Sequence, residues 1–217
     1  VTPGFVSVGL PVGIMEIIQE PSTVDASLTD DPYGVHPSFT TADGYNPNSS
    51  VVAVTRLGGV TSSVSVPDGG LVPGSSGWFD LAGARPADAV AKDVVAVHVD
   101  LSRGAVKGGG GAMPAALARV RELLDDARLY GAQRAAFDRR AMRETHANRA
   151  DLERMQDVLK GKLPLVVRVS RAADILRVLD LGKTYKLRLV LQGVEEGWKV
   201  ADAVAAAKVP VIIRPLT

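Results

Sequence analysis

The alternation of hydrophobic and polar residues is most regular in the last third of the chain. Three short apolar runs predict buried strands, at residues 163–169, 187–191 and 209–213. Helical patterns at 172–181 and 194–207 separate them, and the first of these helices is expected to end at Gly182. Strands that alternate with helices over short connections indicate βαβ units with parallel strands and right-handed crossovers. This third therefore predicts a parallel sheet that helices cover.

The first two thirds of the chain carry weaker signals of the same α/β class. Apolar or β-branched runs predict further strands at 5–8, 60–66, 78–81 and 94–99. A helix is predicted at 50–57, and apolar residues at helical spacing predict a longer one from Pro114 onward. The charge-rich stretch 135–155 predicts solvated helix, with Asp151 as the cap of its last piece.

Three stretches interrupt these patterns. Residues 19–49 are rich in Pro, Ser, Thr, Asp and Gly, which predicts a long surface loop inserted in the domain. The sequence PDGGLVPGSSG at 67–77 predicts a glycine-rich loop. A glycine tract at 108–111 opens a segment, 108–160, that combines this tract with the charged helical stretch.

Composition narrows the function classes. The chain has 217 residues, of which 46% are hydrophobic and 23% charged, as is typical of globular proteins. A net charge of +1 gives no reason to expect a nucleic-acid partner. The absence of cysteine excludes disulfides, thiolate nucleophiles and cysteine metal sites. No apolar run approaches the ~18 residues of a membrane span, and the first residues lack the pattern of a secretory signal.

Candidate chemistry is expected where strands end, because ligands of α/β folds bind at the C-terminal ends of parallel strands. His98 lies near the end of the predicted strand 94–99 and Asp100 directly follows it, and either is a weak candidate for a catalytic base. The histidines lack the spacing of a zinc site, so a hydrogen-bonded structural role for His98 is the alternative. Arg168 could bind a carboxylate through both guanidinium nitrogens, or pair with Asp174 or Glu195 as part of the structure.

The predicted loop at 67–77 is a weak candidate for an anion site. Asp68, Ser75 and Ser76 lie among glycines whose backbone N–H groups could face an anion. The loop matches neither phosphate-binding glycine motif, and its serines are not in a nucleophile elbow. A tight structural loop is therefore the alternative.

Several stretches, in order along nearly the whole chain, resemble the amidohydrolase superfamily, and in particular its imidazolonepropionase-like bacterial branch. They are VTPGFV, YNPNSSVVAVTRLGGVTSSVSVPDGG, GSSGWFDLAG, RELLDDARLYGAQRAAF, LPLVVRVSRAADI, and LRLVLQGVEEGWKVAD followed by VPVIIRPLT. The resemblance implies a TIM-like (β/α)8 barrel over residues 1–217, usually beside a small β-sandwich. By this alignment the chain holds about seven barrel strands and no sandwich. The resemblance also implies hydrolysis of C–N bonds in cyclic amides, with zinc or another divalent metal.

The same alignment finds the metal-ligand positions of the family changed. The first strand of the family ends in His-x-His, and those places hold Gly9 and Pro11. The histidines of the fifth and sixth strands fall at Arg168 and Gly193, and the aspartate of the eighth strand has no counterpart. The resemblance therefore implies the fold and argues against a metal cofactor.

These observations lead to three hypotheses. The first is a pseudoenzyme, a degenerate barrel that acts as a structural or regulatory subunit. Its partner would be another copy, a catalytically intact relative or the remainder of a precursor. The second is an active hydrolase with Arg168 on a substrate carboxylate and His98 or Asp100 as base. The third is an anion-binding module built on Arg168 and the 67–77 loop. The resemblance favours a periplasmic over a cytoplasmic location.

Overall fold

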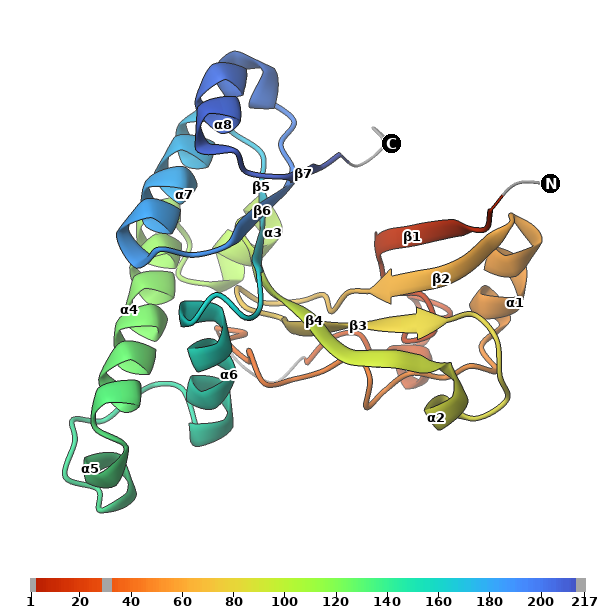
Figure 1. Cartoon of the computed structure of the whole chain (residues 1–217), viewed down its shortest axis with the longest axis horizontal. Helices are drawn as coiled ribbons and strands as arrows, with labels where there is room; N and C mark the ends of the chain where they lie inside the picture. Colours follow the sequence, from red (N-terminus) through yellow and green to blue (C-terminus); the bar gives the residue numbers. More distant parts are fainter. Residues whose placement is uncertain (1–2, 29–32, 214–217) are drawn as a thin grey trace.

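The sheet has seven strands, which neighbour one another in the order in which they occur along the chain. The computed structural model describes residues 3–28 and 33–213. The strands are β1 (Phe5–Leu10), β2 (Val60–Ser65), β3 (Gly74–Asp80), β4 (Val90–Asp100), β5 (Leu165–Val169), β6 (Leu189–Gly193) and β7 (Val211–Ile212). The sheet curls into part of a TIM-like barrel, with β1 and β7 at its two edges (Figure 1). The partial α/β barrel that the sequence predicted is therefore confirmed.

One strand departs from the predicted parallel sheet. β1 is parallel to β2, and β4, β5, β6 and β7 are parallel to one another, whereas β3 is antiparallel to both β2 and β4. The connection from β2 to β3 is residues 66–73, and a parallel crossover needs about a dozen residues or more. The short connection therefore forces β3 to return along β2.

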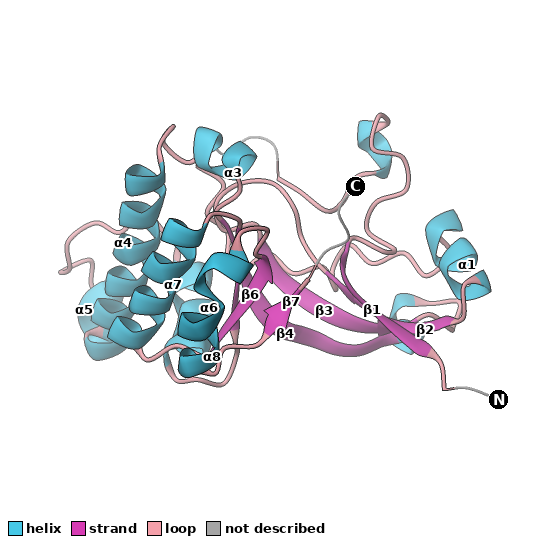
Figure 2. Cartoon of the chain, turned by 90° about the horizontal axis from the view of Figure 1, so that it is seen from above, coloured by secondary structure: helices cyan, strands magenta, loops and turns pink. Residues whose placement is uncertain are grey.

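The helices lie mainly over one end of the sheet. They are α1 (Ser50–Leu57), α2 (Pro86–Ala89), α3 (Arg103–Gly108), α4 (Met113–Ala132), α5 (Arg134–Asp138), α6 (Arg149–Leu159), α7 (Ala172–Tyr185) and α8 (Ala201–Ala207), with 3-10 turns at Pro21–Thr23 and Gly197–Val200. α4, α6, α7 and α8 gather beside β4 to β7, and α1 lies at the far end beside β2 (Figure 2). None of the helices in the described ranges is long and apolar enough to cross a membrane.

Two apolar cores hold these layers together. The larger core packs the helices on β4 to β6, with Leu124, Leu152 and Leu191 fully buried. The smaller core lies by β1 to β3, where the rings of Tyr45 and Phe79 stack with centroids 3.9 Å apart.

Two helix predictions are wrong in detail. The cap of the last helix in the charged stretch 135–155 is Asn148 and not Asp151, because the Asn148 side chain accepts a hydrogen bond from the Asp151 N–H. The irregular segment 139–148 separates this helix, α6, from α5. The Asp151 carboxylate is buried and accepts hydrogen bonds from Ser38. α7 does not end at Gly182 but continues to Tyr185. Glycine at 182 allows the helix to pack closely on the sheet, because an added Cβ would collide with Leu189.

The segment 33–49 is irregular, as predicted, but it does not stay on the surface. β2 pairs with β3 only from Gly77 onward, so the first residues of β3 have a free edge. The 33–49 segment forms backbone hydrogen bonds with this edge at Ser75. The Ser75 N–H donates to the Phe39 C=O (2.7 Å), and the Ser75 C=O accepts from the Thr41 N–H (3.1 Å). Thr41 and Tyr45 are buried as a result.

Candidate functional site

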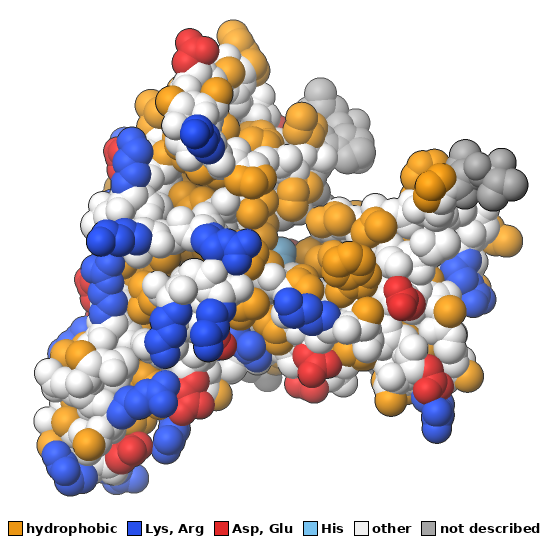
Figure 3. Space-filling model, viewed as in Figure 1, with side chains coloured by type: hydrophobic (Ala, Val, Ile, Leu, Met, Phe, Trp, Pro, Cys, Tyr) orange, Lys and Arg blue, Asp and Glu red, His pale blue; other side chains and the backbone are white. Residues whose placement is uncertain are grey.

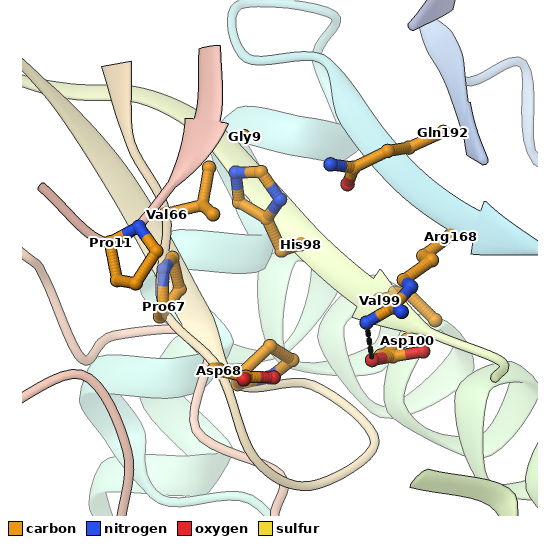
Figure 4. Close-up of a pocket in the computed structure, with 11 residues that line it drawn as sticks. Gly9, Pro11, Val66, Pro67, Asp68, His98, Val99, Asp100, Arg168 and Gln192 are labelled. Carbon is orange, nitrogen blue, oxygen red and sulfur yellow. Dashed lines mark hydrogen bonds and ion pairs between the residues drawn. The ribbon is translucent and has the colours of Figure 1, made fainter. Parts of the chain in front are cut away.

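A small cavity lies where several strands end, at the place in the fold where α/β proteins bind ligands (Figure 4). Its volume is about 50 Å³. The sequence-predicted residues that line it are Gly9, Pro11, Asp68, His98, Asp100 and Arg168, together with Gln192. The structure thus brings together residues that are far apart in the sequence.

Strand register explains why the polar side chains meet. Asp100 of β4 is paired with Arg168 of β5, and Arg168 is paired with Gln192 of β6. Residues paired in this way share one face of the sheet, and His98 lies on the same face because it precedes Asp100 by two positions.

The end of β1 closes the cavity from the other side. Gly9 has φ +90°, a conformation that side chains disfavour, and an added Cβ would lie 2.8 Å from the Gln192 Nε2 atom. Figure 4 shows the His98 ring below Gly9, with the Gln192 side chain pointing toward both. A larger residue at position 9 would therefore push against β6.

An ion pair joins the two charged residues of the cavity. The Arg168 Nη1 atom lies 3.3 Å from the Asp100 Oδ2 atom, and the side chains are 36% and 12% exposed respectively. The Asp100 Oδ1 atom accepts a second hydrogen bond, of 2.7 Å, from the Ser102 N–H. The predicted structural partners of Arg168 were wrong, because the carboxylate that pairs with it is that of Asp100, and Asp174 is occupied by Arg171 and Arg177.

His98 is almost fully buried. Its Nε2 atom lies 2.9 Å from the Ser76 Oγ atom on the neighbouring strand. Burial lowers the pKa of His98 to about 4, because the apolar surroundings penalise the imidazolium. A neutral imidazole that is hydrogen-bonded across the sheet supports the structural interpretation of this residue.

The predicted loop site at 67–77 exists only in part. Asp68 is in the loop, and its Oδ1 atom accepts from the Gly69 N–H at 2.9 Å. Ser75 and Ser76 are instead buried in β3, where the Ser75 Oγ–H donates to the Pro37 C=O. They cannot form an anion-binding loop, because sheet pairing and the 33–49 segment already engage them. Gly193 lies one residue beyond Gln192 and does not line the cavity.

The residues of the cavity do not fit a divalent metal. Glycine and proline side chains offer no ligand atom, and the guanidinium of Arg168 is a permanent cation. Structural and catalytic zinc sites use three or four nitrogen, sulfur or oxygen ligands. Within residues 3–28 and 33–213, no group of three or more His, Asp or Glu side chains could hold a metal ion.

A second, more open hollow adjoins the cavity and shares Asp68, Asp100 and Arg168 with it. Its volume is about 370 Å³, within the roughly 300–1,000 Å³ of small-molecule sites. Two carboxylates and one guanidinium therefore face the same space.

Sequence reasoning named most of the charged residues here but missed several contacts. The apolar wall of the cavity includes Val66, which precedes the 67–77 stretch, and Pro67 and Pro73, which lie within it. The bond between His98 and Ser76 depends on the register of an antiparallel pair, which no local pattern reveals. Pro67 could have been found from its position immediately after a predicted strand.

Comparison with known proteins supports the fold. No protein-family model matches the chain, and no curated protein matches it. Among solved structures, an amidohydrolase from Thermotoga maritima MSB8 matches with a TM-score of 0.86 and 22% sequence identity. The match covers 99% of this chain and 57% of that chain, so this chain spans little more than half the length of the matched protein. The chain therefore has an amidohydrolase-like fold, while the imidazolonepropionase-like branch stays a prediction.

Proposed function

We propose that this chain is a catalytically degenerate amidohydrolase-like barrel that works as a structural or regulatory subunit. The observation that carries the proposal is the ion pair between Arg168 and Asp100, which stands beside Gly9 and Pro11 in the cavity. A guanidinium at this place repels a divalent cation and occupies the carboxylate nearest to it. The fold is retained while the side chains that would hold a metal are replaced.

The size of the cavity supports the same proposal. The enclosed space beside His98 and Arg168, about 50 Å³, is much smaller than the roughly 300–1,000 Å³ of small-molecule sites, and the larger space next to it is the open hollow of about 370 Å³. His98 is also a poor general base near neutral pH, because efficient bases have a pKa close to the working pH.

The partner of such a subunit would bind at β1. The Phe5 N–H donates to the Gly59 C=O on the β2 side. β1 is an edge strand of the described sheet, so the backbone groups on its other side have no strand partner there, and Val6 and Val8 lie in this edge strand. Their side chains are 52% and 45% exposed, and β1 carries no charge that would discourage pairing. We infer that a strand from another chain pairs with β1.

Native mass spectrometry of the protein isolated from its own source tests this proposal. We expect a stoichiometric assembly that dissociates in the variant Val6→Lys, because a charge on the edge opposes strand pairing. The matched control is Val54→Lys, which adds the same charge to an exposed valine of α1. A wild-type chain that is monomeric in its source, or an assembly unaffected by Val6→Lys, would contradict the inferred partner.

The 370 Å³ hollow supports a second candidate function, the binding of a small anion by Arg168. The carboxylates of Asp68 and Asp100 line the same hollow and oppose an anion, so this candidate is weaker. A thermal shift on addition of phosphate or citrate that Arg168→Ala abolishes would support it. If neither ligand shifts the melting temperature, anion binding is contradicted and the scaffold role remains.

A further inference from the structure

A surface far from the barrel cavity concentrates positive charge. It consists of residues 134–149, which are α5, the irregular segment 139–148 and the first residue of α6, and its five arginines are Arg134, Arg139, Arg140, Arg143 and Arg149. Only Asp138 and Glu144 oppose them within 134–149, which leaves an excess of three positive charges in a chain of net charge +1. In Figure 3, several Lys and Arg side chains lie on the surface at the lower left of the molecule, where Figure 1 places α5. We call this region the arginine surface.

The arginine surface contains a hollow of about 650 Å³. Phe137 and Met142, both partly buried, form its apolar floor. Arg140, Arg143 and Arg149 stand around it. Asp138 and Glu144 also line the hollow, and Arg143 and Arg149 are held in ion pairs, so the rim is mixed in charge with a small positive excess at Arg140. An apolar floor beside an unpaired guanidinium suits a ligand that has both an apolar group and a negative charge.

Three of the five guanidiniums form no ion pair within the described residues; Arg134 lies 5.2 Å from the centre of the Tyr130 ring, which leaves Arg139 and Arg140 for such a ligand. Arg143 pairs with the buried Asp126, and Arg149 pairs with Asp138 at 3.2 Å. Arg139 and Arg140 are exposed, and neither forms an ion pair with any residue that the structure describes.

Arg140 also has a conformation that glycine would adopt more readily. It follows the end of α5 with φ 55°, its N–H donates to the Phe137 C=O, and the next N–H donates to the Ala136 C=O. This bonding is the Schellman motif, in which glycine is usual. Lys186 has the same conformation at the end of α7, so the conformation alone marks no site. The shared conformation does provide a matched pair of substitutions, Arg140→Gly and Lys186→Gly.

We propose that the arginine surface binds an acidic segment of a polypeptide, whose carboxylates pair with Arg139 and Arg140 while an apolar side chain enters the hollow. The planar guanidinium matches a carboxylate through two parallel hydrogen bonds. Asp138 and Glu144 interrupt the positive charge, which disfavours the continuous backbone of a nucleic acid.

The surface is independent of the barrel cavity. α4 begins beyond β4 and α3 and ends at α5. Its 20 residues span about 30 Å at 1.5 Å per residue. Binding here can therefore fail without affecting the proposed scaffold role, and the reverse is also true.

Fluorescence anisotropy with a labelled short peptide of Asp, Glu and Leu tests the proposal on the whole chain. We expect saturable binding that weakens as salt increases. The double variant Arg139→Gln with Arg140→Gly should weaken binding about tenfold, since two exposed charge pairs are lost. Arg140→Gly should not destabilise the fold, because glycine adopts the positive φ of this position without steric strain. A loss of binding in this variant is therefore not explained by a loss of folding. The control Lys186→Gly makes the same backbone change elsewhere and should bind as wild type.

Three results would overturn the proposal. The peptide does not bind at low salt, the double variant binds it as tightly as wild type, or a peptide with Lys in place of its acidic residues binds equally well. Oligothymidylate or vesicles of anionic lipid that bind more tightly than the peptide, with the same dependence on Arg139 and Arg140, would replace it with a different class of partner.

Discussion

Acid should destabilise this protein through His98. The imidazole is buried, and its pKa in the folded chain is about 4, whereas an unfolded histidine titrates near 6.5. Between these two values the unfolded chain binds a proton that the folded chain does not. The contribution of His98 to stability is therefore complete above about pH 6.5 and is lost as the pH falls through about 4.

The size of the effect follows from the pKa difference. Each unit corresponds to about 1.4 kcal/mol, so His98 should lower the free energy of unfolding by about 2 kcal/mol between pH 7 and pH 5. The full loss should be about 3 kcal/mol below pH 4. For a domain of ordinary stability, about 5–15 kcal/mol, this is a substantial fraction.

Urea unfolding at pH 7, 6 and 5 measures the effect. Carboxylates also contribute to acid sensitivity, so the informative quantity is the difference between wild type and His98→Gln. A glutamine can hydrogen-bond to Ser76 and does not titrate. His146→Gln, at an exposed histidine, is the control. If the difference between wild type and His98→Gln stays constant within about 0.5 kcal/mol from pH 7 to pH 5, the assignment of His98 as a buried neutral imidazole is refuted.

Three substitutions test the local geometry. Gly9→Ala should destabilise the chain by about 1–2 kcal/mol, because φ is +90° and the new Cβ meets Gln192; chemical denaturation that shows no loss would contradict this conformation. Gly182→Ala should cost about 1–3 kcal/mol, because α7 packs directly on Leu189, and an unchanged melting temperature would show that the contact is loose. Asn148→Ala should cost about 1 kcal/mol through loss of the α6 cap, and Asn148→Ser should recover most of it; equal stability of both variants would argue against capping.

Much of the fold was accessible from the sequence because it depends on local patterns. The strands β5 and β6 and helix α7 follow from apolar periodicity and short connections, which fix parallel βαβ units. The direction of β3 was missed, because the composition of residues 74–77 predicts loop, which makes the connection from β2 look longer than it is. The chain 74–77 reads as a loop by composition, yet pairing with β4 and the 33–49 segment makes it strand.

The candidate site shows the same division. Its members Gly9, Pro11 and Arg168 were found by alignment with a family pattern, and the structure places all three at one cavity. The partner of Arg168 was missed, because Asp100 reaches it only through the register of β4 and β5. Ser76 was assigned to a loop, and its contact with His98 depends on the register of the neighbouring antiparallel strands β3 and β4.

Elemental analysis of the untagged protein, purified from its source without chelators, tests the central claim most directly. The account predicts no zinc, iron or manganese in a fixed ratio to the chain, because the positions at Gly9, Pro11 and Arg168 cannot hold one. One tightly held metal ion per chain, retained through dialysis and bound by side chains of this chain, would contradict it.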